Sequence, residues 1–313
     1  MKEKKKREPF AVRKKRFLEE SKAEIKRSKP SFIVYVVLSA AVVAILVRSL
    51  ITRNYENSAS CVLVLLLFLL PNFVERKLKI EFPMVFEIII FLFIFAAQIL
   101  GEMNSFYIRF PWWDTMLHTL NGFLFAAVGF GLCDIMNQNA EIKFKISPFF
   151  LSLVAFCFSM TIGVLWEFFE FSMDKFFLFD MQKDTLVTQF ASVNFDTTNT
   201  NIMVKVIGIG KTVLYDKDGN VLKVINGGYL DIGISDTMED LFVNLIGALV
   251  FSVFGYLYVK TRGMNKLAKN FIPVLRTDSS KPEAVETEKD GSSLPEKTAK
   301  ETKEETGREE KKE

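Results

Sequence analysis

Side chains that could bind a metal ion or transfer protons occur in three short stretches of this sequence, at the spacing of one helical face. Each stretch holds two acidic residues, or an acidic residue and a histidine, three or four positions apart, and such pairs lie on the same side of an α-helix. The histidine is the only one in the chain. The pairs are Asp114 and His118, Glu167 and Glu170, and Asp236 and Asp240, with Asn121 and Asn244 extending the first and the last.

These residue types favour a metal site. Several carboxylates cannot share a low-dielectric pocket while all are ionised, so a cation, an arginine or protonation must compensate. Carboxylates and imidazole suit zinc, manganese or magnesium, bound singly or as a pair, and helical bundles build such sites from several helices. The predicted ligands of a divalent metal cofactor are Asp114, His118, Glu167, Glu170, Asp236 and Asp240.

Hydrolysis or group transfer is the chemistry expected there, because a bound cation polarises a phosphoryl or acyl group and activates water. The candidate catalytic residues, as ligands or general base, are His118, Glu167, Glu170 and Asp240. Candidate substrate contacts are Arg109, which could hold an anionic headgroup, Trp113 and Asn244. Two plainer interpretations stay open: Trp113 could belong to an interfacial aromatic belt, and Asp236 could cap the following helix.

Membrane spans must position these residues. Half of the chain is hydrophobic, and the apolar residues form runs long enough to cross about 30 Å of hydrocarbon as helices. The sequence therefore predicts an all-α polytopic membrane protein with a six-helix transmembrane bundle. The predicted spans are residues 31–51, 57–74, 84–101, 116–135, 148–171 and 239–260.

Positive charge sets the predicted orientation. The first 30 residues contain thirteen Lys or Arg against five Asp or Glu, and basic residues also follow the second, fourth and sixth spans, so these segments should be cytoplasmic. Both termini then lie in the cytoplasm, the protein lies in the cell membrane, and the acidic pairs lie at the outer face. Because orientation explains the basic residues, nucleic-acid binding has no support. Membrane lipid is the expected partner, and the sequence does not identify a protein partner.

The chain divides into a basic cytoplasmic arm at 1–30, a six-span membrane domain at 31–262 and a charged cytoplasmic tail at 263–313. The low-complexity composition of the tail predicts disorder. Within the membrane domain, residues 172–238 form a long outer loop, which has more acidic residues than lysines and no arginine.

Three β-prone stretches lie in this loop, at 201–206, 211–215 and 221–225. The last two flank Asp216-Lys217-Asp218-Gly219-Asn220, which predicts a small extracellular β-hairpin. A calcium loop fits less well, because the glycine comes one place too early for an EF-hand and no bidentate glutamate follows at the required offset.

The polar positions resemble a known family. The pattern of Asp114, His118 and Gly122, then Trp166-Glu167-Phe168-Phe169-Glu170, then Asp236, Asp240, Asn244 and Gly247-Ala248 is similar to that of the YjdF-like inner-membrane proteins, bacterial multi-pass proteins without an established activity. More distantly it resembles the VanZ-like membrane proteins, which are associated with glycopeptide-antibiotic resistance, although Glu170 stands where that pattern has Gln. The resemblance covers about residues 30–262 and implies a multi-pass fold but no reaction.

Three functions remain open. The first is an enzyme acting on an envelope lipid or its headgroup, the second is a scaffold that binds a partner through the outer loop, and the third is a cation- or proton-coupled transporter. The transporter ranks last because the acidic residues lie near one surface and the spans show no internal repeat or Gly/Pro-broken pair. The sequence contains no P-loop, GxSxG or HExxH motif.

Overall fold

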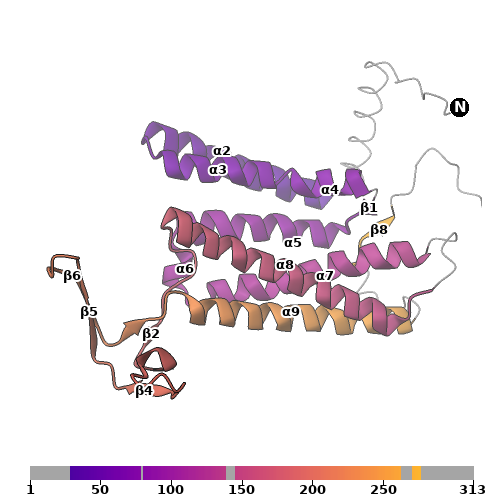
Figure 1. Cartoon of the computed structure of the whole chain (residues 1–313). Helices are drawn as coiled ribbons and strands as arrows, with labels where there is room; N and C mark the ends of the chain where they lie inside the picture. The colour runs from indigo at the N-terminus through magenta and orange to yellow at the C-terminus, as the bar shows by residue number, and fades with distance from the viewer. Residues whose placement is uncertain (1–28, 79, 139–144, 262–269, 276–313) are drawn as a thin grey trace, which may run out of the picture. The chain divides into compact units, whose positions relative to one another are not determined.

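In the described part of the chain, six helical segments are long and apolar enough to cross a membrane. The computed structural model describes residues 29–78, 80–138, 145–261 and 270–275, so the predicted basic arm and most of the predicted tail lie outside the described residues. The candidate spans are Lys29–Ile51, Tyr55–Leu78, Met84–Met103, Trp113–Asn137, Pro148–Phe177 and Ile234–Lys260 (Figure 1). The predicted all-α class with six spans is confirmed, and small antiparallel strand pairs accompany it.

The second and third spans each combine two helical segments. In the second, α3 (Tyr55–Leu67) is followed by α4 (Leu70–Leu78), and Pro71 at this junction has no N–H with which to continue the helical hydrogen bonds. In the third, α5 (Met84–Phe95) continues as the π-helix η1 (Ala96–Met103). Such wide turns occur frequently at functional sites.

The first span, α2 (Lys29–Ile51), packs against α3 and α5. Phe68 and Phe91 meet edge to face at the centre of this contact, with ring centroids 5.6 Å apart. Val42 and Cys61 are fully buried beside them. This apolar cluster contains none of the acidic pairs, whereas Phe86 of the same α5 helix is buried in the other apolar cluster, which includes Phe130.

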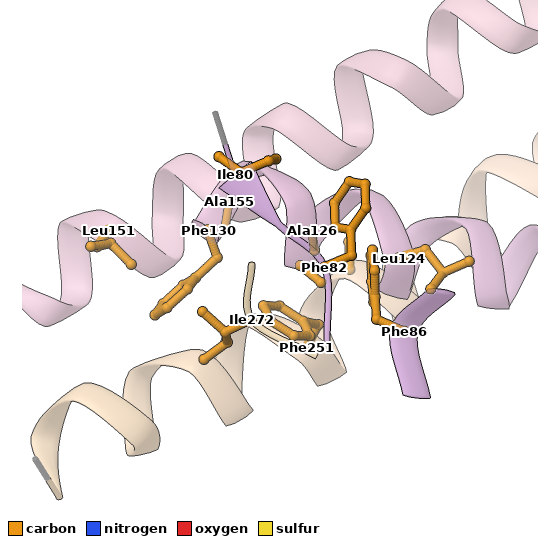
Figure 2. Close-up of a cluster of buried hydrophobic side chains, with 12 residues drawn as sticks. Ile80, Phe82, Phe86, Leu124, Ala126, Phe130, Leu151, Ala155, Phe251 and Ile272 are labelled. Atoms are coloured by element: carbon orange, nitrogen blue, oxygen red, sulfur yellow. The ribbon is translucent and has the colours of Figure 1, made fainter. Parts of the chain in front are cut away.

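The last three spans are α7 (Trp113–Gln138), α8 (Pro148–Phe177) and α9 (Ile234–Lys260), and each packs on the other two. Their apolar core includes Phe130 and Phe251, whose ring centroids are 5.9 Å apart, together with Leu151 (Figure 2). Both α7 and α9 begin before the spans predicted from hydropathy. Polar residues in their first turns lower the apolar average there, although these residues are helical.

Residues 270–275, which we expected to belong to the charged tail, pack against the membrane domain. Ile272 is 3% exposed and joins the core around Phe130. Val274–Leu275 (β8) pairs antiparallel with Ile80–Glu81 (β1). The apolar run from Phe271 to Leu275 is too short to be recognised in the sequence beside the charged residues that follow it.

The predicted hairpin between α8 and α9 is confirmed. β5 (Lys211–Tyr215) pairs antiparallel with β6 (Val221–Asn226). At the tip, the carboxylate of Asp216 accepts hydrogen bonds from the backbone N–H groups of Asp218 and Asn220, 2.9 and 2.7 Å long. Gly219 has a φ of +85°, a conformation that glycine adopts without strain.

Two further strand pairs flank the hairpin. β3 (Gln189–Ser192) pairs with β4 (Val204–Ile207), which overlaps the first predicted β-prone stretch. β2 (Leu186–Val187) pairs with β7 (Tyr229–Leu230) and closes the base of the insertion beside α9. We did not predict β2, β3 or β7, because strands of two to four residues carry too little alternation to be recognised.

Candidate metal centre

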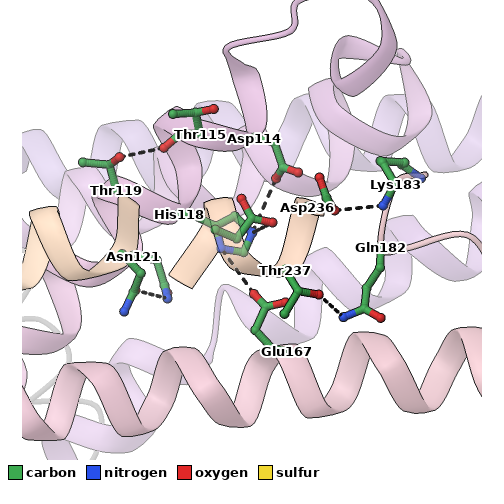
Figure 3. A network of polar contacts seen from close by, with 12 residues as sticks. Asp114, Thr115, His118, Thr119, Asn121, Glu167, Gln182, Lys183, Asp236 and Thr237 are labelled. Carbon is green, nitrogen blue, oxygen red and sulfur yellow. Dashed lines mark hydrogen bonds and ion pairs between the residues drawn. The ribbon is translucent and has the colours of Figure 1, made fainter. Parts of the chain in front are cut away.

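The three acidic pairs lie where α7 and α9 begin and where α8 approaches its end. Each pair spans one helical turn, and Figure 3 shows Asp114, His118, Glu167 and Asp236 directed toward one another from the three helices. In the first two turns of α7 and α9 the pairs are Asp114 with His118 and Asp236 with Asp240, and near the end of α8 the pair is Glu167 with Glu170.

His118 lies among carboxylates from all three helices. Its Nδ1 is 3.8 Å from Oε1 of Glu167. Its Nε2 is 3.5 Å from Oδ1 of Asp114 and 3.7 Å from Oδ2 of Asp240 (Figure 3). Two ligands that are each about 2.0–2.2 Å from one cation lie roughly 3–4 Å from each other. The separations from Nε2 to Asp114 and Asp240 therefore match those of ligands to one cation, while Glu167 faces the other nitrogen of the ring.

Four of these residues can each offer a ligand atom such that all four atoms lie within 4.8 Å of one another. They are His118, Glu167, Glu170 and Asp240, and their exposed fractions are 8, 4, 8 and 3%. A second group with equally close ligand atoms consists of Asp114, Asp236 and Asp240. The structure thus brings together all six residues that the sequence analysis selected as ligands, and we call these six residues the acidic cluster.

The charge of Lys183 acts on Asp114 and Asp236 of the acidic cluster, but the ion pair of Lys183 is with Asp180, outside the cluster. The ion-pair contacts of the cluster are those of His118, and in the described part of the chain no lysine or arginine side chain pairs with its carboxylates. Oε2 of Glu167 is buried and has no hydrogen-bond partner among the described residues. A buried carboxylate oxygen without a partner is costly, so the residues fit a site completed by a cation.

Comparison with known proteins places this cluster in a family. A family model described as "Predicted membrane protein (DUF2238)" matches residues 34–261. The chain belongs to this family. The match includes the whole acidic cluster and confirms the YjdF-like resemblance, whereas the more distant VanZ-like resemblance stays a prediction. No curated protein and no solved structure matches the chain.

In this DUF2238 protein, a segment that we did not predict covers the acidic cluster. Gln182 is 8% exposed, and its Nε2 donates a 2.5 Å hydrogen bond to Oγ1 of Thr237. The backbone N–H of Lys183 donates to Oδ2 of Asp236 over 2.8 Å (Figure 3). Gln182 and Thr237 are 55 positions apart, so no local sequence signal could have identified this contact.

Asp174, one turn beyond the pair on α8, holds this covering segment in place. Its two carboxylate oxygens accept hydrogen bonds from the backbone N–H groups of Met181 and Gln182, 2.7 and 2.8 Å long. These contacts occupy both oxygens of Asp174. Its position therefore explains how the chain turns back over the cluster after α8 ends.

The predicted substrate contacts Trp113 and Asn244 are both buried. Trp113 packs against Phe106, with ring centroids 4.9 Å apart, and its indole nitrogen is buried without a partner among the described residues. Asn244 is 1% exposed, accepts a 3.2 Å hydrogen bond from Nδ2 of Asn121 and donates to Sδ of Met160. Its amide is therefore already engaged between helices.

Arg109 and Tyr107 lie on the short α6 (Phe106–Arg109), just before α7. Arg109 is exposed, and the structure gives it no ion pair with the described carboxylates. The ring of Tyr107, a residue that the sequence analysis did not select, lies directly against Gly101 of η1. Burial, and then the nearby carboxylate of Asp114, raises the pKa of Tyr107 above its usual value, so its phenol stays a neutral hydrogen-bond donor.

Proposed function

We propose that this protein is a membrane enzyme that binds a divalent cation at His118, Glu167, Glu170 and Asp240 and acts on an envelope lipid or its headgroup. The observation that supports this proposal most strongly is the group of four buried side chains whose ligand atoms lie within 4.8 Å of one another. One imidazole and three carboxylates form a donor set that suits zinc, manganese or iron.

The cost of burying these groups supports a bound cation. A charged side chain in a membrane interior costs roughly 2–4 kcal/mol or more, and three carboxylates packed around one imidazole also repel each other. A divalent cation would offset both terms and would supply Lewis-acid activation of a phosphoryl or acyl group and of water. The side chains of the chain itself would orient the substrate and accept or donate protons.

Access from lipid supports a lipid substrate. On α8, the residues that flank the two glutamates are exposed aromatic side chains: Trp166 is 41% exposed and Phe169 is 46% exposed, with ring centroids 5.3 Å apart. In a bilayer this face would contact acyl chains, while the glutamates point inward. The charge asymmetry of the loops favours the outer leaflet as the side of attack, and the exposed Arg109 is a candidate to contact an anionic headgroup.

Metal analysis of the full chain, purified in detergent, tests the site. We expect at least one equivalent of a divalent transition metal that resists gel filtration, and we expect His118→Ala and Glu167→Gln to lose it. Glu239→Gln is the matched control, because Glu239 is an exposed acid next to Asp240. Metal content that is zero in the unmodified protein after loading, or equal in all variants, would rule out the site.

Activity is tested separately, with the purified protein in vesicles of extracted envelope lipids. We expect mass spectrometry to detect a change in one lipid class or headgroup, and we expect a chelator and Glu170→Gln to abolish this change. If the metal binds but no lipid class changes with any extract, the lipid-enzyme proposal fails while the metal site stands.

A scaffold function is the alternative, and the exposed apolar side chains of the β5–β6 hairpin favour it. Leu222 and Tyr215 are 65 and 60% exposed. The hairpin can be removed cleanly, because the backbone N–H of Gly227 donates a 2.8 Å hydrogen bond to the carbonyl of Gly210 and the two ends are adjacent. If joining residue 210 to residue 227 abolishes cellular function but leaves metal content unchanged, the scaffold replaces the enzyme as the better proposal.

A further inference from the structure

Asp240 belongs to both groups of close ligand atoms in the acidic cluster. It completes the first group, with His118, Glu167 and Glu170, and the second, with Asp114 and Asp236. It is 3% exposed, and no other residue is shared by the two groups. An aspartate in this position can give one carboxylate oxygen to each of two neighbouring cations, which is how two-metal hydrolytic sites are commonly bridged.

We infer that the acidic cluster binds two divalent cations, with Asp240 as the bridging ligand. This inference rests on the metal site of the proposed function and adds a second cation position, formed by Asp114, Asp236 and Asp240. The second position has only oxygen donors, which suit magnesium or manganese, whereas the first includes an imidazole. Manganese is accepted by both donor sets.

The position of His118 is consistent with a ligand at the junction of two cations. Its Nδ1 faces Glu167 of the first group at 3.8 Å, and its Nε2 faces Asp114 of the second group at 3.5 Å. Whichever nitrogen binds a cation, the other faces a carboxylate. Imidazoles that bind metals in proteins almost always have such a partner on the second nitrogen, which fixes the tautomer and the ring orientation.

Charge balance also favours two cations over one. The cluster contains five carboxylates, and no lysine or arginine side chain in the described part of the chain pairs with them. One divalent cation would neutralise two of these carboxylates, and two cations would neutralise four. The remaining negative charge can lie on Asp236, because this carboxylate is only half-buried and accepts a hydrogen bond from the backbone N–H of Lys183.

The buried oxygen of Glu167 is an independent indication of a missing ligand. The residue is 4% exposed, and its Oε2 has no hydrogen-bond partner among the residues that the structure describes. Oε1 of the same carboxylate faces His118, so the carboxylate is aimed into the cluster. The side chains of Gln182 and Thr237 also lie close to this carboxylate, and a cation between the cluster residues would give Oε2 a direct ligand contact.

Manganese binding to the full chain in detergent tests the inference, after existing metal has been removed with a chelator. We expect two bound Mn²⁺ per chain and an electron paramagnetic resonance spectrum with the exchange coupling of a bridged pair. Asp114→Asn should keep one Mn²⁺ and lose the coupling, and Glu170→Gln should lose the other ion. Asp240→Asn should remove the coupling, while Glu239→Gln should match the unmodified protein.

The possible failures separate the two proposals. One uncoupled Mn²⁺ per chain, unaffected by Asp114→Asn, would overturn the two-cation inference and leave the single-cation site intact. Two uncoupled ions that persist in Asp240→Asn would overturn it as well. No bound Mn²⁺ in the unmodified chain, with none of the other divalent metals retained, would overturn both. A variant is compared only if it elutes in gel filtration at the same volume as the unmodified protein. If Glu170→Gln fails this criterion, Glu167→Gln replaces it as the variant of the first ligand group.

Discussion

Gly122 of α7 lies against the backbone of Asn244 of α9 so closely that a Cβ atom at position 122 would overlap the Asn244 carbonyl oxygen. The contact is reciprocated one turn away, where a Cβ at Gly247 would overlap the carbonyl oxygen of Thr119. Small residues at a crossing let membrane helices approach backbone to backbone. Because Asp240 lies one turn from Asn244 and His118 lies one turn from Gly122, this approach brings the two side chains within reach of each other.

Replacing either glycine with alanine should separate α7 from α9. We expect Gly122→Ala and Gly247→Ala each to destabilise the protein by roughly 1–3 kcal/mol, the usual cost of overpacking, and to weaken metal binding. Thermal unfolding in detergent and metal titration measure the two effects. Gly210→Ala is the control, because no atom lies within 4 Å of a Cβ at that position and its φ is unexceptional. Equal stability of all three variants would mean that the helices do not pack so closely.

Ser159 of α8 should stabilise the same crossing from the third helix. Its side chain is fully buried, and its hydroxyl donates a 2.7 Å hydrogen bond to the carbonyl of Gly122. We expect Ser159→Ala to cost about 0.5–1.5 kcal/mol, the typical value of such a bond. Ser172→Ala provides the comparison, since that exposed hydroxyl bonds only to the carbonyl of Phe168 in its own helix. The difference in unfolding free energy between the two variants measures the contribution of the interhelical hydrogen bond. Equal unfolding free energies would mean that this bond does not stabilise the protein.

The spans and the spacing of the acidic pairs could be predicted from the sequence because both are local properties. A run of apolar residues identifies a span, and residues such as Glu167 and Glu170 reveal their shared face by separation alone. The contact of Gln182 with Thr237 depends on a loop that turns back over the bundle, so no local sequence pattern predicts it. The role of Asn244 could not be predicted either, because the residue type does not reveal whether an asparagine packs between helices or binds a substrate.

Asp216 should make the order of the hairpin tip depend on acidic pH. Hydrogen bonds from the side chain and backbone of Asn220 lower the pKa of Asp216 below its usual value. A group whose pKa is lower in the folded state stabilises that state at pH values above its unfolded pKa, about 3.9, and loses this contribution as the pH falls through the folded value. The tip should therefore remain ordered at pH 5 and loosen only in stronger acid.

Amide exchange or nuclear magnetic resonance of the Asn220 N–H in the detergent-solubilised chain follows this change. Asp216→Ala should produce the loosened tip at every pH, whereas Asp218→Ala should not, because the contacts at the tip use the Asp218 backbone rather than its carboxylate. A tip that loosens with the same pH dependence in Asp216→Ala would assign the effect to another group.

Gln182 should control how readily the acidic cluster exchanges its metal with solvent. The residue connects the segment after α8 to Thr237 of α9, and the segment is also held by backbone hydrogen bonds to Asp174 and Asp236. We expect Gln182→Ala to lose the side-chain contacts with Thr237 and Glu167 while the backbone hydrogen bonds remain. The variant should increase hydrogen exchange at residues 181–185 and speed metal release to a chelator several-fold, with the amount of metal bound at saturation unchanged. Asp180→Asn is the matched control, because Asp180 is an exposed residue whose side chain pairs only with Lys183. Faster release in both variants would point to general loosening of the loop, and unchanged release in Gln182→Ala would show that the metal leaves by a route that this segment does not cover.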